Sequence, residues 1–211
     1  MTEQRTAATY PPMVAILRGV TPDEIIPIAE SVYRAGFRYI EVPLNSPNPL
    51  ESIARLVDHF GDRACCGAGT VTSAEQVEEL ASVGARLVVS PNCDPQVIRS
   101  SLKYDMISMP GFFTPTEAFA AISAGATFLK LYPAASLGAD YVKNLKTVLP
   151  GHVQLLAVGG ISLENMDIFS RAGVDGFGIG GDLYKPGHSK AEVADLAGAY
   201  MKMFAALKDT N

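Results

Sequence analysis

The stretch TPTEAFAAISAGATFLKLYP, residues 114–133, contains one complete copy of the unit from which the chain is built. It opens on T-x-x-E, typical of a capping box, in which two side chains satisfy unpaired N–H groups at a helix start. Pro115 stands at the first helical position, where proline is tolerated best. Gly125 suits the left-handed cap that ends a helix, and the apolar run FLKL is typical of a buried strand. The stretch therefore predicts a helix followed by a strand.

The same unit recurs along the chain. T-x-x-E also begins at Thr21 and Thr72, and S-x-x-E begins at Ser189. Eight apolar runs are candidate strands: MVAILRG, YIEVPL, ACCGAGTV, LVVSP, MISMPG, TFLKLYP, VQLLAVGG and GFGIGGDL. Alternating strands and helices predict an α/β fold with a parallel sheet, and the count favours a single-domain (β/α)8 TIM barrel. An open doubly wound sheet is the alternative.

The length and composition are those of one globular domain. A chain of 211 residues can form one barrel, which we expect to span residues 13–211 after a tail or short cap at residues 1–12. Apolar residues make up 48% and charged residues 18%, as in ordinary soluble domains. The net charge of -5 and the lack of a Lys/Arg-rich run argue against nucleic acid or a membrane surface as partner.

The sequence contains no recognisable targeting or membrane segment. Its start is polar, and no run approaches the roughly 18 apolar residues of a membrane span. Cys65, Cys66 and Cys93 lack the spacing of a zinc site and are expected to be free thiols. These features predict a cytoplasmic protein.

Charged residues interrupt three of the predicted strands. Residues of a barrel strand alternate between the lumen and the helix layer. Lys130 stands between two leucines, and Glu41 stands between isoleucine and valine, so both side chains are expected in the lumen. Arg18 ends the first strand. We expect the three charges to converge at one end of the barrel.

Two interpretations of Lys130 and Glu41 are open. They could form a structural ion pair, although a buried pair is weak evidence for stability. The functional interpretation is favoured because active sites of this fold lie at the C-terminal ends of the strands. A desolvated lysine near another cation has a lowered pKa and can attack a carbonyl as a neutral amine. Glu41 would then transfer protons.

Paired glycines follow the last two predicted strands. Gly159 and Gly160 precede a helix that we expect Ser162 to cap, and Gly180 and Gly181 precede Asp182. Glycine lets backbone N–H groups approach an anion, and barrels commonly bind phosphate at these two loops. The pairs therefore predict a phosphate site, although either could serve only as turn residues.

Neither a metal nor a nucleotide cofactor is predicted. No two of the histidines, His59, His152 and His188, have the spacing of metal ligands. No dinucleotide-binding or P-loop motif is present.

Motifs at nearly every strand end carry a resemblance to a known family. VAILRG, IEVPLNSP, GAGTV, SPN, PGFFTPTEAF, FLKLYP, AVGGI and GIGGDLYKPG are similar to those of the class I 2-keto-3-deoxy-6-phosphosugar-acid aldolases. The resemblance runs from about residue 10 to the C-terminus. It implies a (β/α)8 barrel that uses no metal and assembles as a homotrimer.

The resemblance also implies roles for individual residues. Lys130 would form the Schiff base and Glu41 would be the acid/base. The remaining contacts fall into three groups: Arg18 and Thr70 at the pyruvate end, Pro91 and Tyr132 along the pocket, and Gly159, Gly160, Gly181 and Asp182 at the phosphate end.

The implied reaction is that of a carbon–carbon lyase. The resemblance favours cleavage of 2-dehydro-3-deoxy-6-phospho-D-galactonate to pyruvate and D-glyceraldehyde 3-phosphate, with the gluconate epimer as the alternative. Asn45 bears on this choice, because gluconate-type members resemble the chain here but carry arginine at this position and threonine at Pro43. Asparagine offers neutral donors and an acceptor in place of a permanent charge, although Asn45 could serve only as a turn residue.

Two other classes of function are open on the residues alone. A barrel of isomerase or synthase type could bind a sugar phosphate without imine chemistry, and a non-catalytic barrel could simply bind one. A mere binder has no need of a desolvated amine, so Lys130 favours the aldolase.

Overall fold

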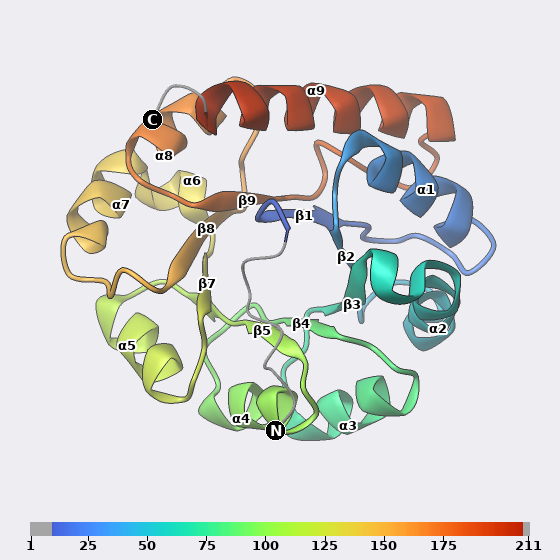
Figure 1. The fold of residues 1–211 in the computed structure, drawn as a ribbon, viewed down its shortest axis with the longest axis horizontal. Helices are drawn as coiled ribbons and strands as arrows, with labels where there is room; N and C mark the ends of the chain where they lie inside the picture. The colour runs from blue at the N-terminus through green and yellow to red at the C-terminus, as the bar shows by residue number, and fades with distance from the viewer. Residues whose placement is uncertain (1–9, 209–211) are drawn as a thin grey trace.

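The computed structural model describes residues 10–208 and contains one parallel sheet that curves into a barrel surrounded by helices (Figure 1). Neighbouring strands follow the order β5-β4-β3-β2-β1-β9-β8-β7-β6. The strands are β1 (Met13–Ile16), β2 (Tyr39–Pro43), β3 (Cys65–Gly69), β4 (Leu87–Val89), β5 (Ile107–Met109), β6 (Gly111–Phe112), β7 (Phe128–Leu131), β8 (Gln154–Val158) and β9 (Gly176–Ile179).

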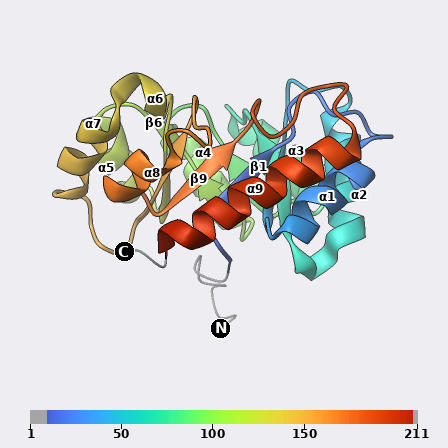
Figure 2. The ribbon, with the colours of Figure 1, turned by 90° about the horizontal axis from the view of Figure 1, so that it is seen from above.

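Helices connect successive strands and cover the outside of the sheet. They are α1 (Ile25–Ala35), α2 (Pro49–Phe60), the 3-10 helix η1 (Gly61–Arg63), α3 (Ala74–Ser82), α4 (Pro95–Lys103), α5 (Pro115–Ser123), α6 (Ala134–Leu137), α7 (Ala139–Lys146), α8 (Met166–Arg171) and α9 (Lys190–Lys208). The longest, α9, lies alongside α1 in both views (Figures 1 and 2), where the Ser31 hydroxyl donates a hydrogen bond to the Lys190 carbonyl. Within residues 10–208, no helix is long and apolar enough to span a bilayer.

The fifth predicted strand is divided into β5 and β6 by Pro110. β5 pairs with β4, and β6 pairs with β7. Proline has no N–H to donate to a ladder, but its carbonyl still accepts a hydrogen bond of 2.9 Å from the Lys130 N–H. The barrel of eight strands is confirmed, and its ninth segment comes from this interruption.

Side chains alternate between two apolar layers. The lumen cluster contains Val14, Ile16, Tyr39, Cys65, Leu87, Val89, Met109, Phe128, Leu156 and Val158. Ile40, Val42, Leu129 and Leu131 instead pack in the larger cluster between sheet and helices. The predicted alternation around Glu41 and Lys130 is therefore confirmed.

The capping motifs are partly as predicted. Thr114 and Glu117 form the expected reciprocal box at the start of α5. The prediction at Thr72 is wrong by one residue, because Ser73 is the cap of α3 and Gln76 is its partner. The amide oxygen of Gln76 accepts from the N–H groups of both Thr72 and Ser73, which favours the shifted position.

The N-terminal end of the barrel is closed by the first described residues. The Tyr10 ring meets the Tyr39 ring edge-on at 5.8 Å, and its hydroxyl donates to the Asp62 carbonyl. The Pro12 carbonyl accepts a hydrogen bond from the N–H of Phe177 in β9. Residues 1–9 of the predicted tail, and residues 209–211 at the end of the predicted domain, lie outside the described residues. The domain bounds stay a prediction.

Candidate active site

Within residues 10–208, Lys130 and Glu41 are the charged side chains that are buried in the barrel. Lys130 on β7 is 7% exposed, and Glu41 on β2 is 2% exposed. Lys130 lines an interior pocket with apolar residues of four other strands, among them Ile16, Val89 and Val158. The alternation of β2 and β7 thus buries an amine and a carboxyl inside the barrel, near enough for each to affect the pKa of the other.

The Lys130 amine makes few contacts. Its Nζ donates a hydrogen bond of 3.2 Å to the Ser90 carbonyl and lies 4.7 Å from the centre of the Tyr132 ring. Lys130 and Glu41, both among the described residues, form no direct ion pair with each other. This arrangement weakens the interpretation of the pair as a structural salt bridge.

Burial shifts both groups toward their neutral forms. Desolvation lowers the pKa of Lys130, and the nearby Arg18 lowers it further, while Glu41 opposes the shift. Desolvation raises the pKa of Glu41, against the opposing effects of Lys130, Arg18 and the Gly69 backbone. Because removing a charge from water is costly, the desolvation effect dominates at each group. Both shifts make the neutral amine and the protonated carboxyl more accessible than they are for ordinary lysine and glutamate side chains.

Gly69, which the sequence analysis did not single out, borders the Glu41 carboxyl. A methyl group at Gly69 would lie 2.0 Å from Glu41 Oε2 and 2.3 Å from its Cδ. Oε2 is buried and has no hydrogen-bond partner among the described residues. The available signal was the alternation of small residues in CCGAG, which places Cys65, Gly67 and Gly69 on one face of a strand.

Arg18 and Asn45 meet at the exposed mouth of the barrel. Arg18 Nη1 donates a hydrogen bond of 2.5 Å to Asn45 Oδ1. A second bond of 2.9 Å, from the Gly19 N–H to the Ser46 hydroxyl, ties together the same two loops after β1 and β2. Asn45 therefore does more than shape a turn, since it orients the guanidinium.

Three more predicted residues lie just after barrel strands: Thr70, predicted at the pyruvate end, and Pro91 and Tyr132, predicted along the pocket. Thr70, directly after β3, has a φ of 60°, a left-handed conformation that is unusual for a β-branched residue. Such strain is often found at functional sites. Pro91 follows β4 and is half-buried, and Tyr132 follows β7 and is 41% exposed.

The loops after β8 and β9 carry the predicted phosphate end. Gly159 and Gly160 have φ values of 90° and 72°. A methyl at Gly160 would lie 2.6 Å from the Ala135 Cβ, so this position requires glycine. Among residues 10–208, nothing accepts a hydrogen bond from the N–H groups of Gly160, Gly181 or Asp182. Free N–H groups of this kind suit an anion.

One prediction for these loops is wrong. Ser162 does not cap α8, which begins at Met166 with Asn165 at the capping position. The Ser162 hydroxyl instead accepts a hydrogen bond from the Glu164 N–H, in a turn before the helix. That short turn delays the helix by one turn relative to the sequence pattern.

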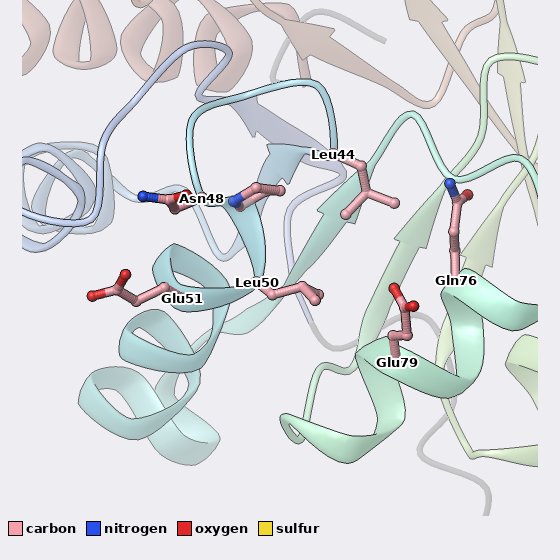
Figure 3. A pocket seen from close by; sticks show the side chains of 7 residues that line it. Leu44, Asn48, Leu50, Glu51, Gln76 and Glu79 are labelled. Atoms are coloured by element: carbon pink, nitrogen blue, oxygen red, sulfur yellow. The ribbon is translucent and has the colours of Figure 1, made fainter.

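A second hollow lies outside the barrel, between α2 and α3. Figure 3 shows Leu44 and Leu50 facing Gln76 and Glu79 across it, with Glu51 at one side. Its lining contains two carboxylates and no cation, which does not suit a phosphorylated acid. None of the predicted site residues lines it. The barrel mouth is therefore the better candidate for the active site.

The remaining reactive side chains offer little alternative chemistry. Within the described part of the chain, no group of three or more His, Cys, Asp or Glu residues could hold a metal ion. The cysteines form no disulfide, and burial raises the pKa of Cys66 to about 12. A thiol with so high a pKa is a poor nucleophile at neutral pH.

Known proteins share both the sequence and the barrel. A family model described as KDPG and KHG aldolase matches residues 5–194. The chain is 46% identical over 193 residues to 2-dehydro-3-deoxy-6-phosphogalactonate aldolase of Escherichia coli (strain K12), covering 92% of this chain and 94% of the relative. It is 30% identical over 144 residues to 2-dehydro-3-deoxy-phosphogluconate aldolase of Treponema pallidum (strain Nichols), covering 68% of each.

A solved structure has the same architecture along nearly its whole length. The structure, described as native KDPGal, superposes with a TM-score of 0.92 at 45% identity, covering 94% of this chain and 96% of that chain. The barrel fold is thus common to both proteins.

Proposed function

Because the chain belongs to the KDPG and KHG aldolase family, we propose that it cleaves 2-dehydro-3-deoxy-6-phospho-D-galactonate to pyruvate and D-glyceraldehyde 3-phosphate. The observation that carries the proposal is the buried Lys130 amine, whose pKa is lowered and which is not ion-paired with the nearby Glu41. A neutral amine is the form that attacks a ketone.

Lys130 is the nucleophile in this mechanism. Its Nζ adds to the C2 ketone of the substrate to form a carbinolamine. The carbinolamine hydroxyl then takes a proton from the Glu41 carboxylic acid or from solvent and leaves as water, which gives a protonated imine. When the C3–C4 bond breaks, its electron pair moves toward the imine nitrogen and forms an enamine. The covalent intermediate thus replaces one difficult carbanion-forming step with easier ones.

Glu41 moves the protons. As a carboxylate it accepts the proton of the C4 hydroxyl, directly or through a water, so that C4 leaves as the aldehyde of glyceraldehyde 3-phosphate. The resulting carboxylic acid then gives a proton to C3 of the enamine, and hydrolysis releases pyruvate and the amine. Burial raises the pKa of Glu41 toward the working range of such a group, in which both protonation states are accessible.

The two ends of the substrate would bind to opposite sides of the mouth. Arg18, held by Asn45, and the strained Thr70 are assigned to the pyruvate carboxylate. Pro91 and Tyr132 are assigned to the pocket wall. The N–H groups of Gly159, Gly160, Gly181 and Asp182 are assigned to the phosphate, since backbone donors bind an anion without adding a positive side chain.

The galactonate epimer is favoured for two reasons. The identity to the galactonate enzyme is higher than that to the gluconate enzyme, at 46% against 30%. In addition, Asn45 accepts a hydrogen bond from Arg18 and so orients its guanidinium at the mouth. An arginine at position 45, as in the gluconate-type members, would instead repel Arg18. The substrates differ only at the C4 hydroxyl, and a site that binds a hydroxyl in one orientation can discriminate strongly against the other.

We further propose a cytoplasmic homotrimer. The family resemblance supports this assembly. Several large apolar side chains of the described surface are partly exposed, including Phe113 and Phe119, as expected where subunits meet.

Assay of both epimers tests the proposed function. Pyruvate release is followed with a coupled dehydrogenase, and the galactonate compound should give the higher kcat/KM. A large preference for the gluconate compound would transfer the assignment to the alternative. If neither compound is cleaved but both bind, the chain is a non-catalytic sugar-phosphate-binding barrel.

A further inference from the structure

Two glycines of β3 face the lumen but lack side chains for different reasons. At Gly67, a methyl group would lie 1.9 Å from the carbonyl oxygen of Leu87, which belongs to the backbone of the neighbouring strand β4. At Gly69, a methyl group would instead overlap the carboxyl of Glu41, at 2.0 Å from Oε2 and 2.3 Å from Oε1. Glycine is therefore required at position 67 by the close approach of the β4 backbone, whereas at position 69 it is required by the Glu41 side chain.

The Glu41 carboxyl is held in place by the shape of its surroundings. Its Oε2 has no hydrogen-bond partner within residues 10–208, and neither Lys130 nor Arg18 forms a direct ion pair with the carboxyl. The hydrogen bond that does act on the carboxyl comes from the backbone of Gly69 itself. A flexible side chain that no other side chain binds adopts a rotamer that its neighbours leave free. The space above Gly69 is the room that the observed rotamer needs.

We propose that Gly69 is a positioning residue whose missing side chain forms the slot that holds the Glu41 carboxyl beside Lys130. This inference rests on the proposed aldolase function, in which Glu41 transfers protons to and from the imine and enamine on Lys130. A methyl group at Gly69 would rotate the carboxyl out of the slot. The backbone of β3 could stay in place, because the obstructing atoms are the end of a flexible side chain.

The variant Gly69→Ala separates imine formation from proton transfer. Pyruvate alone forms the imine with Lys130, and removal and return of a methyl proton in D2O exchanges hydrogen for deuterium at pyruvate C3. We expect Gly69→Ala to slow this exchange by about 10²-fold, in the range for loss of a general base. Borohydride trapping of the pyruvate imine should stay within a few-fold of the unmodified protein.

A double variant shows whether the loss acts through Glu41. Gly69→Ala combined with Glu41→Gln should exchange no more slowly than Glu41→Gln alone, because groups in contact give non-additive effects. Losses that multiply would overturn the proposal, as would exchange at the normal rate in Gly69→Ala. Gly198→Ala in α9, where a methyl meets nothing within 4 Å, is the matched control and should leave exchange unchanged.

If Gly69→Ala folds poorly, thermal unfolding provides a second test of the proposal. Removing the carboxyl in Gly69→Ala/Glu41→Ala should then raise the Tm above that of Gly69→Ala, because the overlap is gone. An equally low Tm would place the clash elsewhere and contradict the proposal. A separate result, no borohydride-trapped pyruvate in the unmodified protein, would reject the aldolase function itself.

Discussion

At the scale of single residues, the active site depends on groups whose neutral forms are favoured by burial. Lys130 has a backbone carbonyl and an aromatic ring as its contacts, and Glu41 has an oxygen without a partner. An arrangement of this kind stabilises the fold poorly, since a hydrophobic pair would pack at lower cost. The same features suit a nucleophilic amine and a proton carrier.

Replacement of Glu41 by glutamine tests the proton-transfer role. Glu41→Gln keeps the shape of the side chain but cannot carry a proton, so kcat should fall by about 10²- to 10⁴-fold. The coupled pyruvate assay measures the loss. Glu79→Gln, a matched change at an exposed position of the hollow outside the barrel, should retain normal activity. Near-normal kcat in Glu41→Gln would move the acid/base role to another group.

The pH dependence of imine formation follows from the Lys130 pKa. Because only the neutral amine attacks, the rate should rise with pH and level off above the pKa of Lys130. Burial lowers that pKa, so the plateau should begin below the pH of about 10.4 at which an ordinary lysine titrates. Arg18 lowers the pKa as well, and Arg18→Gln should move the profile to higher pH. Stopped-flow measurement with pyruvate gives the profile, and an inflection at the ordinary lysine value would contradict the burial argument.

The sequence predicts correctly which way a side chain points when the alternation along a single strand determines its direction. The lumen positions of Lys130 and Glu41 follow from alternation along β7 and β2. The slot at Gly69 could not be predicted, because it depends on how β3 lies against β2 in space. The bond between Arg18 and Asn45 likewise depends on the relative placement of two loops.

At the scale of elements, the chain specifies its helices by local caps, and the predictions failed where two caps compete. Thr72 and Ser73 are adjacent, and both could begin α3. Gln76 favours Ser73 as the cap, because its amide oxygen accepts hydrogen bonds from the N–H groups of both Thr72 and Ser73. The interruption of the fifth strand at Pro110 is of another kind, since proline removes one donor from the ladder.

Two threonine variants compare a true cap with its neighbour. Thr114→Ala removes the side-chain acceptor of the α5 capping box and should lower the free energy of unfolding by about 1 kcal/mol. Thr72→Ala leaves Ser73 in place and should cost clearly less. Chemical denaturation measures both. Equal losses would show that the cap assignment at α3 is wrong.

At the scale of the whole molecule, the closed sheet brings charges from distant parts of the chain to one mouth. Glu41 from β2 and Lys130 from β7 come near each other only because the strands close into a barrel (Figure 1).

The proposed homotrimer can be tested by light scattering, which should give a mass three times that of the chain. Phe119→Glu, at a partly exposed apolar side chain of α5, serves as a probe of whether this face lies between subunits. A stable monomer of the unmodified protein would contradict the proposed assembly.

The central claim is that Lys130 forms a Schiff base with the keto acid, and reductive trapping tests it most directly. The protein is treated with borohydride in the presence of pyruvate, digested and analysed by mass spectrometry, with Lys130→Arg as the control. We predict one reduced pyruvate adduct, located on Lys130 and absent from the control. An unmodified Lys130, or an adduct on a different lysine, would contradict the account.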